Sequence, residues 1–103
     1  MRIALFSPFT NGPLRGNMIT VQRIAHHLPA VDCESTTIGL DTTSLDQAQQ
    51  LINRFQPELL HAFHAYHSGP AARLLALRNR RPYLITMTGS DLYDPNFYNH
   101  PDT

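Results

Sequence analysis

Short apolar runs alternate with helical patterns three times along this chain, and this alternation constrains the fold more than any other feature of the sequence. The first run, RIALFS at residues 2–7, is closed by Pro8, and its length and composition predict a central strand covered on both faces. Further strands are predicted at residues 33–40, 58–63 and 83–88. Because each strand-helix-strand step implies a right-handed crossover, we expect an α/β fold: a Rossmann-like three-layer α/β/α sandwich with a mainly parallel sheet of about four strands.

Caps and apolar spacing mark the helices between these strands. The first helix is predicted to follow Asn17, a candidate N-cap, and to stop before Pro29. The second begins with Ser44 and Gln47, which have the spacing of a capping box. The third covers residues 71–79. Helices that each follow a strand in this way are expected to cover both faces of the sheet.

Length, composition and charge exclude several classes of protein. At 103 residues the chain is one domain at most, and its 42% apolar and 16% charged residues are typical of a globular protein. No apolar run approaches the roughly 20 residues of a membrane-spanning helix, and no signal peptide is evident, so we expect a cytoplasmic protein without an integral membrane segment. The formal net charge of +0 offers no field to attract nucleic acid. The single Cys33 excludes an internal disulfide and suits a reducing compartment.

The loop after the first strand is the first candidate ligand site, because ligands of open parallel sheets bind beyond the carboxyl ends of the strands. Gly12 and Gly16 would let the backbone approach a ligand, and the helix that follows Asn17 would offer unpaired N–H groups to an anion. Arg15, between the glycines, also favours an anionic ligand. The loop matches neither GxGxxG nor a P-loop, and the glycines could equally serve only to form a turn.

Three histidines lie within one short segment, at His61, His64 and His67. Alternate side chains of a strand point to opposite faces, so the rings of His61 and His64 would not converge on a metal ion, and no HExxH pattern supports zinc. We therefore expect no metal site. His64 falls at or just beyond the carboxyl end of its strand, where it could act as a catalytic residue or simply form hydrogen bonds beside the sheet. His61 is expected to pack against the sheet.

The loop after the last predicted strand combines small and polar residues that could hold sugar hydroxyls. Its candidate substrate-binding residues are Thr88, Gly89, Ser90 and Asp91. Asp91 could equally cap the backbone that follows it, which is the usual role of aspartate in a tight turn.

Four motifs taken in chain order point to a family. They are a first strand ending in Ser-Pro, a Gly-x-x-x-Gly-Asn loop, a third strand ending in HAFHA and a fourth ending in TMTGSDLY. Together they resemble the N-terminal half of GT-B glycosyltransferases of the family-4 type, over residues 1–95, with residues 96–103 left as a tail. The GNMITVQR segment at residues 16–23 and the TGSDLY segment are similar to the branch related to selenosugar synthases.

The resemblance implies a glycosyltransferase of the hexosyltransferase type, whose N-terminal domain binds the acceptor. A C-terminal domain, which these residues do not contain, would bind a nucleotide sugar as co-substrate, and no other cofactor is expected. Gly12, Gly16 and Asn17 would line the cleft, and His64 would correspond to the family's histidine after the third strand. Thr88 departs from the pattern, because relatives usually have a sugar-contacting histidine there. Without the second domain, the isolated chain is expected to be inactive.

Two other interpretations belong to different classes of function. A small flavodoxin-like binding module could use the glycine-rich loop to hold an anion, but no acidic cluster follows the first strand as a receiver-like site would require. An interaction protein could pair with a second copy through an open sheet edge or through apolar residues of the tail. These tail residues are Leu92, Tyr93, Phe97 and Tyr98.

Overall fold

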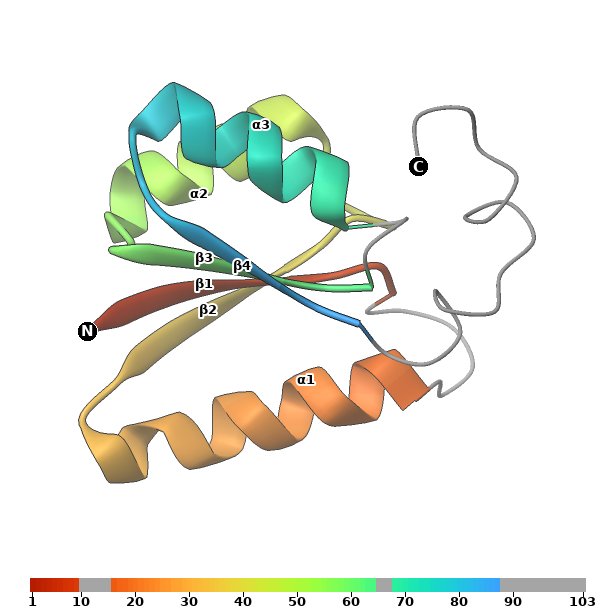
Figure 1. Ribbon diagram of the computed structural model, residues 1–103, viewed down its shortest axis with the longest axis vertical. Coiled ribbons are helices and arrows are strands. Elements are labelled where there is room, and N and C mark those ends of the chain that lie inside the picture. Colours follow the sequence, from red (N-terminus) through yellow and green to blue (C-terminus); the bar gives the residue numbers. More distant parts are fainter. Residues whose placement is uncertain (10–15, 65–67, 88–103) are drawn as a thin grey trace.

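The computed structural model describes residues 1–9, 16–64 and 68–87, and within them strands and helices alternate as the sequence predicts (Figure 1). A short 3-10 turn, η1, follows the first helix. The elements in chain order are β1 (Arg2–Ser7), α1 (Gly16–His27), η1 (Leu28–Val31), β2 (Glu34–Gly39), α2 (Leu45–Phe55), β3 (Leu59–Phe63), α3 (Gly69–Asn79) and β4 (Tyr83–Thr86).

The four strands form one parallel sheet in the order β2-β1-β3-β4. β1 lies between β2 and β3, which confirms its prediction as a central strand. Helix α1 lies on one face of the sheet, and α2 and α3 lie on the other (Figure 1). The protein is therefore a small Rossmann-like α/β domain with three layers.

Strand register sorts the side chains onto the two faces. Leu5 of β1 is aligned with His61 of β3, and both belong to the face that α1 covers, whereas the next pair, Phe6 and Ala62, belongs to the α2 and α3 face. Leu5 and Phe6 are both fully buried, so β1 is apolar on both faces. Burial of each such side chain stabilises the folded state by about 1.5–3 kcal/mol. A strand that is buried on both faces is apolar at consecutive positions, which explains the continuous apolar run of β1.

Helix α1 packs mainly against β1 and β2, so it covers only part of its face of the sheet. Leu84 of β4 is aligned with His61 and therefore lies on the same face, yet it remains 53% exposed. The half of this face formed by β3 and β4 is thus more open than the half beneath α1.

Two of the predicted element boundaries are corrected by the structure. Helix α1 already includes Gly16, so Asn17 lies in its first turn and the prediction of Asn17 as N-cap is wrong. Glycine can adopt helical dihedral angles, so its presence did not mark the end of the loop. Strand β4 ends at Thr86, two residues before the predicted limit. At the other end of α1, the helix stops at His27 and Pro29 falls within η1, as expected for a residue that lacks an N–H group.

Candidate functional site at the carboxyl edge of the sheet

The carboxyl ends of all four strands lie at one edge of the sheet, because the strands are parallel. The starts of α1 and α3 lie at the same end of the molecule (Figure 1). β2 follows β1 in the chain and lies on one side of it in the sheet, whereas β3 and β4 lie on the other side of β1. The direction in which successive strands are added therefore reverses between β1 and β3. Ligands of open α/β sheets bind at such a reversal, which makes this edge the candidate site.

His64 follows β3 directly and is 2% exposed. Its backbone is left-handed, with a φ of 79°, which costs a non-glycine residue on the order of 1 kcal/mol or more. Two hydrogen bonds hold it there: the His64 N–H donates to the carbonyl of Thr86 over 3.0 Å, and the His64 carbonyl accepts from the Ser68 N–H over 2.9 Å. These bonds fix the backbone of His64 beside the ends of β3 and β4, and the catalytic role of His64 stays a prediction.

His61 lies inside β3, and its imidazole packs against the sheet as predicted. Its Nε2 is 2.6 Å from Oγ1 of Thr86, and its ring stacks on Phe63 with centroids 4.3 Å apart. Burial lowers the pKa of the His61 imidazole from its usual 6.5, because desolvation penalises the charged ring. His61 is therefore a neutral hydrogen-bonding partner of β4 at neutral pH.

Ser68 is a residue of this edge that the sequence prediction missed. It is fully buried at the start of α3, its side chain forms no cap, and its Oγ has no hydrogen-bond partner in the described structure. A buried hydroxyl without a partner costs about 1–3 kcal/mol. A serine before Gly-Pro is a recognisable helix-start signal, so the position of Ser68 could have been found from the sequence.

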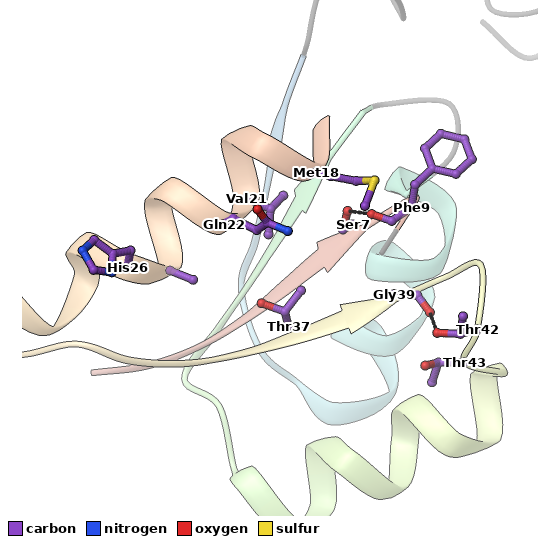
Figure 2. A pocket seen from close by; sticks show the side chains of 11 residues that line it. Ser7, Phe9, Met18, Val21, Gln22, His26, Thr37, Gly39, Thr42 and Thr43 are labelled. Atoms are coloured by element: carbon purple, nitrogen blue, oxygen red, sulfur yellow. Dashed lines mark hydrogen bonds between the residues drawn. The ribbon is translucent and has the colours of Figure 1, made fainter. Parts of the chain in front are cut away.

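A groove opens on the other side of β1, between α1 and β2, and no motif predicted it. Its volume is about 650 Å³, within the range of roughly 300–1,000 Å³ that is usual for small-ligand sites. Figure 2 shows Thr37 of β2 opposite Val21 and Gln22 of α1, with Phe9 towards one end and His26 towards the other. The groove forms where residues of α1, β2 and the segment after β1 come together in the fold, and no local sequence signal reports this arrangement.

The predicted site residues are only partly placed by the structure. Gly16 and Asn17 lie in the first turn of α1, and α1 begins at the same end of the molecule as the carboxyl end of β3, which His64 follows. The other predicted binding residues lie outside the described residues: Gly12, Arg15, Thr88, Gly89, Ser90 and Asp91. His67 and the apolar tail residues also lie outside them. The binding roles of all these residues therefore stay predictions.

Across the described ranges, no three or more histidine, cysteine, aspartate or glutamate side chains gather to hold a metal ion. None of the helices described is long and apolar enough to cross a membrane.

A parallel sheet with helices on both faces defines a small α/β domain of the Rossmann-like class. A family model described as glycosyl transferase 4-like matches residues 2–100. The chain therefore belongs to the glycosyl transferase 4-like family. Comparison with curated proteins and with solved structures gave no significant match.

Proposed function

We propose that this chain is the acceptor-side domain of a glycosyltransferase, and that it forms the N-terminal half of a GT-B fold. The match of the glycosyl transferase 4-like family over residues 2–100 carries the proposal. The position of His64 at the reversal of the sheet supports it, since this is where an acceptor bound at the domain edge would meet a catalytic side chain. Residues 1–95 form the domain in this proposal, and residues 96–103 form a tail.

The complete enzyme transfers a sugar from a nucleotide-sugar donor, which a C-terminal Rossmann-like domain in the same or a separate chain binds. The acceptor side alone lacks this donor pocket, so the isolated chain should transfer no sugar. We place the enzyme in the cytoplasm and, from the GNMITVQR segment, in the branch related to selenosugar synthases.

A transfer assay on the complete enzyme tests the role of His64. The variant His64→Asn removes the imidazole but keeps a residue type that tolerates left-handed backbone. Loss of general acid-base catalysis typically lowers the rate about 100-fold or more, so we expect kcat/KM for sugar transfer to fall by that factor. The matched control is His27→Asn, because His27 is exposed at the end of α1.

Unchanged kcat/KM in a folded His64→Asn enzyme would remove His64 from the mechanism. Sugar transfer by the isolated 103-residue chain would show that the acceptor side does not need a donor domain.

A further inference from the structure

Strand β4 lies at one edge of the described sheet but has the composition of an interior strand (Figure 1). Leu84 lies on the α1 face and is 53% exposed. Ile85 lies on the opposite face, near Gly69 at the start of α3, and is 40% exposed. The strand at the other edge, β2, is polar over residues 34–37, as is usual for a strand edge that faces water. β4 therefore leaves apolar surface open on both of its faces.

The backbone of β4 has an open edge as well. The carbonyls of Pro82 and Thr86 accept hydrogen bonds over 3.1 and 3.0 Å from N–H groups on the β3 side. Successive residues of a strand direct their backbone groups to alternate edges, so the N–H and C=O groups of Tyr83, Ile85 and Met87 point away from β3. Among the described strands, none pairs with this edge.

These outward backbone groups are self-complementary about a twofold axis at Ile85. In an antiparallel pair of β4 strands, Ile85 lies opposite the partner's Ile85, and Tyr83 lies opposite the partner's Met87. Opposed residues that both direct their backbone groups to the other strand exchange both N–H···O bonds. The same register places the two Ile85 side chains together on one face and Leu84 beside the partner's Thr86 on the other. Because both copies use the same strand, the pairing closes as a dimer.

The charges that flank β4 favour this antiparallel direction. The charged residues just before the strand are basic: Arg78, Arg80 and Arg81. Residues 82–103 contain no lysine or arginine, and their acidic residues are Asp91, Asp94 and Asp102. Antiparallel pairing brings the basic start of one strand beside the acidic segment that follows the other, whereas parallel pairing would place like charges side by side. The charge pattern is therefore complementary to a second copy of the same chain.

From these observations we infer that the open edge of β4 binds β4 of a second copy of this chain, so that the two sheets join into one. In the joined sheet the two carboxyl edges face opposite ends, and His64 of neither copy belongs to the paired strand. The inference does not rest on the proposed function, because the pairing involves no sugar transfer.

Sedimentation equilibrium of the 103-residue chain tests the pairing. We expect the mass to rise with concentration from 11.6 kDa towards twice that value. The variant Leu84→Lys replaces an exposed apolar side chain by a charge in both copies, and a lysine on an edge strand opposes pairing. The dimer Kd should therefore rise at least about tenfold.

Two further variants separate the edge from general effects on folding. Met87→Lys changes an equally exposed residue just beyond β4, so it should weaken the dimer without altering the strand itself. Val31→Lys is the matched control, because Val31 is 67% exposed in η1, which contacts the opposite edge strand β2. It adds the same charge away from β4 and should leave the dimer Kd unchanged. Circular dichroism checks that each variant is folded.

Isotope-filtered NMR on a mixture of ¹³C-labelled and unlabelled chains tests the register, since it detects contacts between chains alone. We expect NOEs between the ring of Tyr83 and the methyl group of the partner's Met87. A dimer without these NOEs would contradict the register.

Three other outcomes would overturn the inference. The first is a mass of 11.6 kDa at every concentration. The second is an unchanged dimer Kd in folded Leu84→Lys and Met87→Lys chains, which would place the interface elsewhere. The third is a set of NOEs within one chain from Tyr83 to Leu92 or Phe97, which would show that the chain covers this edge itself.

Discussion

His61 and His64 lie in different environments, because β3 ends between them. His61 is held inside the strand by Phe63 and Thr86, whereas His64 lies beyond it in left-handed backbone. Strand alternation predicted that these two rings would not form a shared metal site, but alternation cannot predict the positive φ of His64. That angle is supported by two backbone hydrogen bonds. The His64 N–H donates to the carbonyl of Thr86, which is distant in sequence, and the His64 carbonyl accepts from the N–H of Ser68.

The lowered pKa of His61 predicts a dependence of stability on pH. The imidazole is neutral in both the folded and the unfolded chain well above pH 6.5, so it causes no change there. As the pH falls below 6.5, the unfolded chain takes up the proton first, and the free energy of unfolding falls until the folded chain is protonated as well. Urea unfolding of the unaltered chain and of His61→Gln between pH 7.5 and pH 5 measures this loss.

The comparison needs a variant that changes a histidine outside the sheet. His27→Gln serves, because His27 is exposed, and it should retain the acid-dependent loss that His61→Gln reduces. If the two variants lose the same free energy of unfolding on acidification, His61 does not contribute to the pH dependence.

Helix starts show how far single elements follow from the sequence. The predicted capping box of α2 is confirmed: the Gln47 N–H donates to Ser44 Oγ over 3.2 Å, and the Ser44 N–H donates to Gln47 Oε1 over 2.9 Å. This motif is local, so the sequence contains all its information. The start of α3 differs, because the burial of Ser68 Oγ is decided by the packing of the helix against the sheet.

Substitution of the two serines at these helix starts should therefore have opposite consequences. Ser44→Ala removes a bonded cap and should lower the free energy of unfolding by about 0.5–2 kcal/mol. Ser68→Ala removes a buried hydroxyl that has no partner, so the free energy of unfolding should stay unchanged or rise by up to about 1–3 kcal/mol. Urea denaturation of both variants measures the difference. A Ser68→Ala variant destabilised as much as Ser44→Ala would show that Ser68 Oγ has a stabilising partner.

Strand β4 is the element that the sequence predicted least completely. It is shorter than its apolar run, and among the described strands it pairs with β3 alone. Leu84 and Met87 are each 53% exposed. Large apolar side chains are usually buried, but burial depends on whether another element covers β4, which local composition does not determine. Self-association through this edge stays a prediction.

At the scale of the whole molecule, the order of strands and helices was predictable because it depends on periodicity along the chain. The parallel sheet, the central β1 and the helices on both faces are confirmed. The groove between α1 and β2 was not predictable, since Thr37 and Gln22 are distant in sequence and meet only after folding. The family match relates the chain to glycosyltransferases. The fold alone does not, since one fold supports many functions.

The central claim is that this domain works with a donor-binding half. The most direct measurement is to capture the native product from its source cell with an antibody to this domain, and then to determine its mass, composition and sugar transfer from nucleotide sugars. We predict that the captured species contains a second, nucleotide-binding Rossmann-like half and transfers sugar. Recovery of a single 11.6 kDa chain without partner or transfer activity would contradict the claim.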